Sequence, residues 1–365
     1  MGSPAPSSHA EPPLIRALRG EAVRPCPVWF MRQAGRHLPE YLAVRATTPD
    51  FISFCLTPDK AAEVTLQPLA RYHMDAAILF ADILLIPGAM GRDVRFVKGT
   101  GPVLDPITPE AAAGLRADGA AERLAPVYET CRRVRAGLPD GAALIGFAGA
   151  PWTVATYMVE GRGTPTKEAA KRFAYQYAPE TDHMLAALAD ATAEYLVEQA
   201  RAGAQALQIF ESWAQGLSPA LFDRLVVAPT RRIVRSVRAA GVDVPIIGFP
   251  RAAGLNALRY PEATGVDALA LGTDVPIQEV RARFPTLPLQ GNLDPLALRI
   301  GGEVLRNSVD RLLADISGPH VFNLGHGVSP DVKIANVEAV VNRVRGKPAR
   351  FVPGTPPESA VERAA

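Results

Sequence analysis

Short, continuous apolar runs alternate with longer segments of helical periodicity along almost the whole chain, and this alternation limits the fold more than any other feature. Runs that are apolar on both faces are typical of parallel strands buried between layers of helices. Seven runs are predicted as strands, and an eighth at 27–31 could join them. The seven are 76–80, 143–147, 206–210, 245–249, 268–271, 287–290 and 321–324.

The segments between these runs carry apolar residues at spacings of three and four, which predicts helices. Examples are 124–134, 221–237, 305–316 and 337–344. Ser329, Pro330 and Asp331 resemble a helix start and predict that the last helix begins there. Seven or eight strand–helix units favour an α/β fold of the (β/α)8 TIM-barrel type. A doubly wound open sheet is the alternative, although no GxGxxG motif follows an early strand.

A single domain is expected, with a tail at each end. The 365 residues could form two ordinary domains, but α/β barrels run to about 250 residues or more as one. No linker divides the core. We predict a disordered tail over 1–13, the barrel over 14–345, and a loose C-terminal tail rich in Pro, Glu and Ala over 346–365.

Charge, hydropathy and cysteine usage exclude several classes of protein. The net charge of +2 argues against non-specific binding to nucleic acid. No apolar run approaches the ~18 to 20 residues that span a bilayer, and the N-terminus does not resemble a secretory signal. Cys26, Cys55 and Cys131 are odd in number, widely spaced and without a CxxC motif. We therefore expect no disulfide framework and a cytoplasmic location.

Polar residues and glycines follow the predicted strands at their carboxyl ends, where barrels build their active sites. They are Asp82, Gly149, Glu211 with Ser212, Arg251, Asn292 with Asp294, and His326. Structural interpretations exist for these residues: Asp82 could cap a helix or form a turn, Ser212 could cap a helix, and His326 could simply pack. Glu211 and Asp294 could also be the carboxylate pair of a glycosidase.

Two arginines lie four residues apart in MRQAGRHLPEY, at 31–41. One helical turn would place Arg32 and Arg36 on the same face. Guanidinium groups grip carboxylates with two parallel hydrogen bonds, so this pair suits a polyacidic ligand. A solvated basic turn is the alternative, but the apolar residues before it and Pro39 after it favour a constrained segment.

Two long stretches resemble signatures of the uroporphyrinogen decarboxylase family: PVWFMRQAGRHLPEY at 27–41 and GFAGAPWTVATYMVEG at 146–161. ILFADILLIP, FESWA, GNLDP and FNLGHG resemble further blocks of the family in the expected order. The resemblance covers roughly 14–345. It implies a distorted (β/α)8 barrel, usually a homodimer, that works without metal or organic cofactor. The implied reaction, in haem biosynthesis, removes CO2 from the four acetates of uroporphyrinogen III to give coproporphyrinogen III.

The resemblance also implies roles for individual residues. Arg32 and Arg36 would bind substrate carboxylates close to the chemistry, and Asp82 would accept hydrogen bonds from the pyrrole N–H groups. The remaining contacts would be Tyr157, Ser212 and His326 for carboxylates, and Phe147 and Phe210 for the macrocycle. The chain departs from the usual family pattern at His37, at 270–274, and at Trp213 and Gln215.

Decarboxylation leaves an electron pair that needs an acceptor, and a pyrrole protonated at a ring carbon can take it. That intermediate is cationic, so a fixed carboxylate in a dry pocket would stabilise it. Asp82 fits this role. The source of the protons stays open, because arginine is a poor acid with a pKa above ~12.

Two other functions fit parts of the sequence. Corrinoid or thiol methyltransferases of the same superfamily bind zinc through a His/Cys set. The three cysteines here lie far apart, and His183 and His320 have no Cys or His at ligand spacing, so no metal site is predicted. A non-catalytic tetrapyrrole-binding protein would keep the arginines and aromatics but would not need Asp82.

Overall fold

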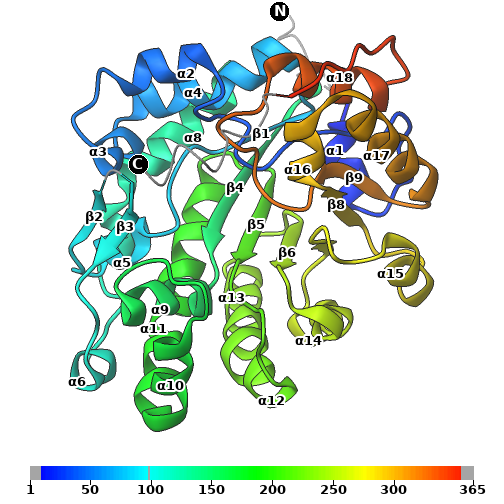
Figure 1. The fold of residues 1–365 in the computed structure, drawn as a ribbon. Helices are drawn as coiled ribbons and strands as arrows, with labels where there is room; N and C mark the ends of the chain where they lie inside the picture. The colour runs from blue at the N-terminus through cyan, green and yellow to red at the C-terminus, as the bar shows by residue number, and fades with distance from the viewer. Residues whose placement is uncertain (1–9, 98, 355–365) are drawn as a thin grey trace, which may run out of the picture.

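Seven parallel strands form the central sheet of the computed structural model, which describes residues 10–97 and 99–354 (Figure 1). The strands lie side by side in chain order: β1 (Ala76–Ile78), β4 (Ala143–Gly149), β5 (Ala206–Glu211), β6 (Ile246–Pro250), β7 (Ala268–Ala270), β8 (Leu289–Leu293) and β9 (His320–Leu324). All seven predicted strands are confirmed, with ends shifted by a few residues.

The eighth predicted run closes the ring without becoming a regular strand. This closing segment, residues 27–31, lies between β9 and β1. The amide of Phe322 donates to the carbonyl of Pro27 over 2.8 Å, and the amide of Trp29 donates to Phe322 over 3.3 Å. On the other side, the amide of Asp75 donates to the carbonyl of Val28 over 2.9 Å. A doubly wound sheet would leave β1 and β9 as free edges, so the TIM-type barrel is confirmed.

Helices follow the strands and cover the outside of the barrel. The longer ones are α4 (Pro58–Tyr72), α8 (Ala125–Gly137), α9 (Pro151–Glu160), α10 (Glu168–Gln176), α11 (Ala178–Arg201), α13 (Ala228–Ala239), α17 (Gly302–Asp315) and α18 (Ile334–Val344). The shorter ones are α1 (Pro13–Leu18), α2 (Pro39–Arg45), α3 (Phe51–Cys55), α5 (Leu85–Ala89), α6 (Pro109–Ala113), α7 (Ala120–Arg123), α12 (Pro219–Phe222), α14 (Tyr260–Thr264), α15 (Ile277–Arg283) and α16 (Pro295–Ile300), with a π-turn at Asp223–Val227 and a 3-10 turn at Gly254–Leu258.

A small antiparallel hairpin stands apart from the barrel. Its strands are β2 (Val94–Val97) and β3 (Gly101–Leu104), and it lies at the edge of the molecule beside α3 and α5 (Figure 1). The hairpin therefore extends one rim of the barrel.

The last helix begins later than predicted. It starts at Ile334, and Ser329 instead opens a turn in which the amide of Val332 donates to its carbonyl over 3.2 Å. The amide of Val328 is bonded to the carbonyl of Met31 over 2.9 Å. Val328 and Val332 are also buried, so this stretch follows the closing segment inward instead of starting a helix.

The predicted tails lie partly outside the described residues. Within the described part, Pro13 opens α1, and the segment before residue 355 is hydrogen-bonded to the barrel. The amide of Gly302 donates to the carbonyl of Val352 over 2.9 Å, and the amide of Val352 donates to the Asn336 side chain over 3.0 Å.

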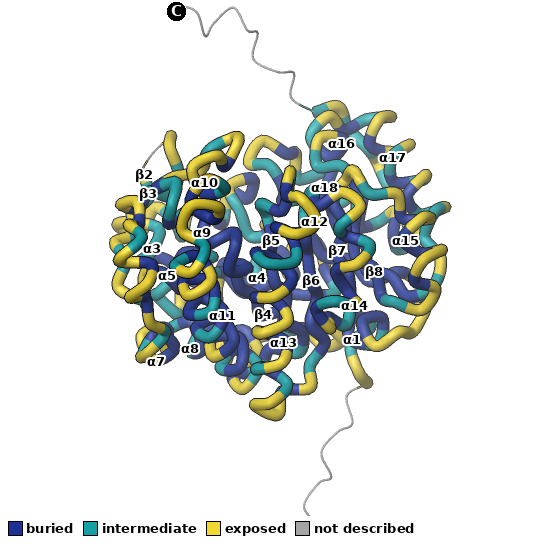
Figure 2. Tube along the Cα trace, turned by 90° about the horizontal axis from the view of Figure 1, so that it is seen from below, coloured by how far each residue is buried: buried dark blue, intermediate teal, exposed yellow. Residues whose placement is uncertain are grey.

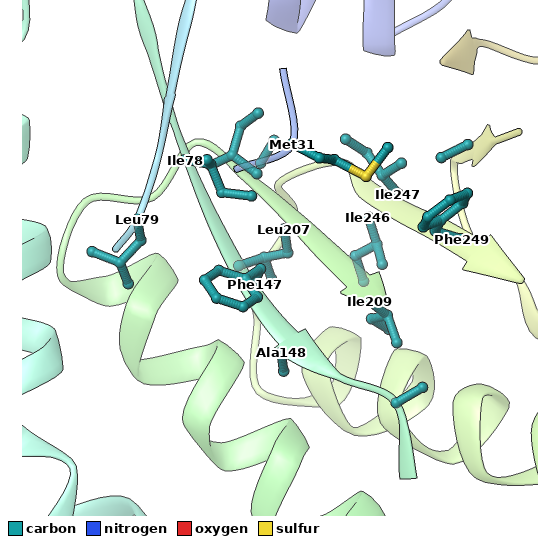
Figure 3. Close-up of a cluster of buried hydrophobic side chains, with 14 of the residues drawn as sticks. Met31, Ile78, Leu79, Phe147, Ala148, Leu207, Ile209, Ile246, Ile247 and Phe249 are labelled. Carbon is teal, nitrogen blue, oxygen red and sulfur yellow. The ribbon is translucent and has the colours of Figure 1, made fainter. Parts of the chain in front are cut away.

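The strands of the central sheet are buried on both faces, whereas the exposed residues lie on the surrounding helices and loops and on the small hairpin (Figure 2). Figure 3 shows part of this core, where apolar side chains of β1, β4, β5 and β6 lie beside Met31 of the closing segment. A buried hydrogen-bond chain adds specificity: Trp29 Nε1 donates to Gln290 Oε1 over 3.1 Å, and Gln290 Nε2 donates to Gln208 Oε1 over 3.1 Å. The chain ties the closing segment to β8 and β5.

Candidate active site

The arginine segment consists of turns and not of the helix that its spacing predicts. Arg32 has the left-handed backbone conformation, with φ at 63°, and α2 begins only at Pro39. The buried side chain of Gln33 explains the difference. It accepts from the amide of Phe30 over 3.0 Å and donates to the carbonyl of Ala76 over 2.9 Å. These bonds fix the backbone in a turn, so the helical prediction for this pair is wrong.

Arg32 lies directly over Gly327, in the loop after β9. A Cβ at position 327 would come within 2.4 Å of Arg32 Cδ and 2.7 Å of Cγ, far inside van der Waals contact. Only glycine leaves room for the arginine there. This packing brings Arg32 beside His326, although 294 residues separate the two in the chain.

Asp82 follows β1 at the same end of the barrel. One of its oxygens accepts from the amide of Leu84 over 2.8 Å, which fixes a turn before α5, and no described side chain caps that helix. No described residue donates a hydrogen bond to the other oxygen. Burial raises the pKa of Asp82 to about 6, while the positive charge of Arg32 acts in the opposite direction. The carboxylate is thus partly desolvated and faces a cation.

His326 is neutral in this environment. Burial, together with the positive charges of Arg32 and Arg251, lowers its pKa to about 3. At neutral pH its imidazole therefore offers an N–H donor and not a positive charge.

The aromatic residues predicted to face a macrocycle lie on neighbouring strands. The rings of Phe147 and Phe210 meet edge to face at 5.6 Å between centroids, and Phe249 on β6 continues the row at 6.0 Å from Phe210. Tyr157, on α9, packs against Trp213 at 6.2 Å. Burial raises the pKa of the Tyr157 hydroxyl, and the negative charge of Asp82 adds to this effect.

Ser212 lies on a turn after β5 that is fixed from two sides. Its amide donates to Thr153 Oγ1 over 2.7 Å, and its carbonyl accepts from the guanidinium of Arg251 over 3.3 Å. The serine hydroxyl takes part in neither bond and so is available to a ligand.

The two carboxylates of the glycosidase alternative have separate structural partners. Glu211 is wholly buried, and one of its oxygens accepts from the Thr153 hydroxyl and from the amide of Trp213. Burial raises the pKa of Glu211 to about 7. Asp294 caps α16 by accepting from the amide of Leu296 over 2.8 Å. Nothing in this arrangement supports paired acid and base roles.

Arg36 is exposed at the rim. Its charge acts on the hydroxyl of Tyr41, whose ring packs against Phe80 at 5.7 Å between centroids, two residues before Asp82. The structure therefore joins Arg32, Asp82, Tyr157 and His326 through direct electrostatic interactions. Arg36 lies on the neighbouring rim, and no hydrogen bond or ion pair among the described residues joins it to these four.

Two cationic groups near the site had no predicted role. Lys167, before α10, holds its ammonium 3.8 Å from the centre of the Trp213 ring, a cation–π contact. Arg251 follows β6. Its position at the carboxyl end of a strand does not by itself assign it a role. The sequence pattern does not predict a role for Lys167, because this residue lies in the loop before α10 and not at the end of a strand.

Within residues 10–97 and 99–354, no three His, Cys, Asp or Glu side chains are grouped to hold a metal ion. Cys26, Cys55 and Cys131 are all free and buried. None of the helices described here is long and apolar enough to cross a bilayer. Two cavities, of about 620 and 490 Å³, lie elsewhere and contain none of the predicted site residues.

Fold and site together define an α/β-barrel enzyme whose mouth gathers cations and hydrogen-bond donors around one desolvated carboxylate. The chain belongs to the uroporphyrinogen decarboxylase family: the family profile described as "Uroporphyrinogen decarboxylase (URO-D)" matches residues 9–346. This confirms the family that the sequence motifs indicated.

Relatives named uroporphyrinogen decarboxylase match almost end to end. The protein of Maricaulis maris is 53% identical over 92% of this chain and 98% of its own, and that of Phenylobacterium zucineum is 54% identical over 94% and 100%. A solved structure, "methyltransferase from Methanosarcina mazei", has a TM-score of 0.74 at 18% identity, covering 91% of this chain and 97% of its own. At that identity the likeness shows a shared fold alone.

Proposed function

We propose that the protein decarboxylates the four acetate side chains of uroporphyrinogen III to methyl groups, giving coproporphyrinogen III and CO2 in haem biosynthesis. The observation that carries the proposal is the desolvated carboxylate of Asp82 beside the cation of Arg32. It is supported by the family and by relatives of that name.

Each decarboxylation consumes one proton. Protonation of a pyrrole carbon makes the ring an electron acceptor. The bond between the acetate methylene and its carboxylate then breaks, CO2 leaves, and the electron pair enters the ring. A second proton on the methylene carbon completes the methyl group as the ring proton is lost. Asp82 stabilises the cationic ring by charge, and accepts hydrogen bonds from the pyrrole N–H groups.

The surrounding residues bind and orient the substrate. Arg32 and Arg36 supply positive charge for the substrate carboxylates. Of the two, Arg32 is the one whose charge acts on Asp82. The neutral donors are Tyr157, Ser212 and His326. Phe147 and Phe210 supply the apolar surface against which the macrocycle lies.

Anaerobic incubation with enzymatically made uroporphyrinogen, followed by chromatography of the oxidised products, tests the function. Coproporphyrin, with partly decarboxylated intermediates at short times and no added cofactor, is the expected result. Unreacted uroporphyrin from folded protein would reject it. Stoichiometric zinc would then favour methyl transfer, and tight binding without zinc would favour a tetrapyrrole carrier.

We also infer that the enzyme is a cytoplasmic homodimer. The family resemblance supports the dimer, and three buried thiols without a disulfide partner suit a reducing compartment. Sedimentation velocity checks the assembly: twice the chain mass of 38.9 kDa is expected, and a species of the single mass would contradict it.

A further inference from the structure

We propose that Arg251 is an additional carboxylate-binding residue of this site. The inference rests on the proposed function, because it assigns one more cation to the same polycarboxylate substrate. Neither the sequence motifs nor the family resemblance gave Arg251 a role.

The backbone places Arg251 at the turn that carries Ser212. β5 and β6 pair in parallel, with Glu211 opposite Pro250, and the amide of Arg251 donates to the carbonyl of Glu211 over 2.9 Å. The side chain then reaches across to the carbonyl of Ser212. The guanidinium therefore lies beside the residue whose hydroxyl the proposed function gives to a substrate carboxylate.

The guanidinium also faces the other side of the mouth. Its positive charge lowers the pKa of His326. The pKa of Arg251 itself is lowered by the positive charge of Arg32 and raised by the negative charge of Asp274. No described carboxylate lies within ion-pair distance of it. A partly buried cation near a second cation is unfavourable until an anion joins them. This is the electrostatic state expected of an anion site before its ligand arrives.

Two other arginines show what a structural role looks like in this chain. Arg259, eight residues later, forms an ion pair with Asp223 at 2.6 Å. Arg281, which is buried, donates to four backbone carbonyls, those of Phe284, Pro285, Leu287 and Pro319. Arg251 makes one long side-chain bond of 3.3 Å, and a guanidinium has five N–H donors. Most of its donors remain available for a ligand.

The backbone directly after Arg251 is strained. Ala252 is left-handed, with φ at 57°, a conformation that is unfavourable for a residue with a side chain. Such strain persists where surrounding structure requires it, and functional sites are common examples. The strained residue adjoins the one cation of this loop that lacks a carboxylate partner among the described residues.

The number of charges on the substrate calls for another cation. Uroporphyrinogen carries eight carboxylates, four acetates and four propionates. Arg32, Arg36, Tyr157, Ser212 and His326 provide five groups for them, of which two are cations. Arg251 adds a third cation between the Ser212 turn and Arg32, so that one carboxylate can bridge the two sides of the mouth.

Binding of uroporphyrin, the oxidised fluorescent octacarboxylate, to the full-length protein tests the inference, together with KM and kcat for the decarboxylation. Arg251→Gln should raise Kd and KM about 10- to 100-fold, the range for losing a charged hydrogen-bonded contact. Arg251→Lys should restore part of the affinity. Arg306→Gln, on the exposed face of α17, removes the same charge and should change Kd less than about twofold.

The outcomes separate the inference from the proposed function. The affinity of wild type should fall more steeply with NaCl concentration than that of Arg251→Gln, because one ion pair is missing in the variant. A Kd within about twofold of wild type would overturn the inference and leave the function intact. A loss that lysine does not restore, with a lowered Tm, would also overturn it, because that pattern reports a collapsed turn. Wild type that binds uroporphyrin but releases no CO2 would reject the function, while the Kd comparison would still decide the role of Arg251.

Discussion

Replacing Asp82 with Asn should make the protein less active and more stable at the same time. The substitution keeps the size of the side chain and an oxygen that can accept from Leu84. It removes the negative charge that the proposed reaction needs beside the cationic pyrrole. Loss of one preorganised charge contact typically costs a factor of about 100 to 1,000 in kcat.

The stability gain follows from the raised pKa. Burial moves the pKa of Asp82 from 3.8 to about 6, and this difference corresponds to about 3 kcal/mol against the ionised form in the folded state. Because the folded pKa lies above the unfolded one, the penalty is absent below pH 4, grows between pH 4 and 6, and is complete above pH 6. Because the pKa of about 6 already includes the attraction of Arg32, we expect a gain of up to about 3 kcal/mol at pH 7.5.

Two measurements check this reasoning. Urea unfolding of wild type and Asp82→Asn at pH 7.5 and pH 4.5 should give a difference that is large at the higher pH and small at the lower one. Turnover of uroporphyrinogen by the same preparations gives the loss in kcat. Wild-type turnover in the variant would refute the catalytic role, and a variant less stable at both pH values would refute the desolvation argument.

Three further changes test other parts of the structure. Gly327→Ala places a Cβ 2.4 Å from Arg32 Cδ, so kcat/KM should fall about 10- to 100-fold with Tm nearly unchanged; normal kinetics would contradict this packing. Glu211→Gln mimics the protonated form of Glu211, whose pKa is raised to about 7. In urea titrations the variant should therefore be more stable than wild type at pH 8.5 but not at pH 5. Equal effects at both pH values would argue against a buried charge. Trp29→Phe leaves Gln290 Oε1 without its donor and should cost about 1–3 kcal/mol in urea unfolding; an unchanged midpoint would show that the buried chain is replaceable.

The strands and the positions at their ends could be predicted because their signals are local. A strand buried on both faces is a continuous apolar run, and a residue that follows such a run in a parallel barrel lies at the mouth. This rule alone, without any family resemblance, predicts that Asp82, Ser212 and His326 lie at the mouth. The family motifs added their roles, which stay predictions.

The details that failed depend on partners far away in the chain. The turn at Arg32 is set by Gln33, which bonds to Ala76, and the late start of α18 is set by the bond from Val328 to Met31. Spacing alone cannot reveal either contact. The inferred role of Arg251 likewise cannot be predicted from the sequence, because it depends on the distances between its guanidinium and the carboxylates of the folded chain.

The closing segment has a consequence for the order of assembly during synthesis. Val28 pairs with Phe322, so the barrel ring joins a residue near the start of the chain to one near its end. Arg32 follows Val28 in the chain, and Gly327, against which Arg32 packs, follows Phe322. A nascent chain that still lacks its last strand therefore has neither a closed ring nor a complete substrate site. Contacts of such long sequence separation are slow to form. Catalytic competence should therefore appear only after residues 320–327 have been synthesised and have packed on the closing segment.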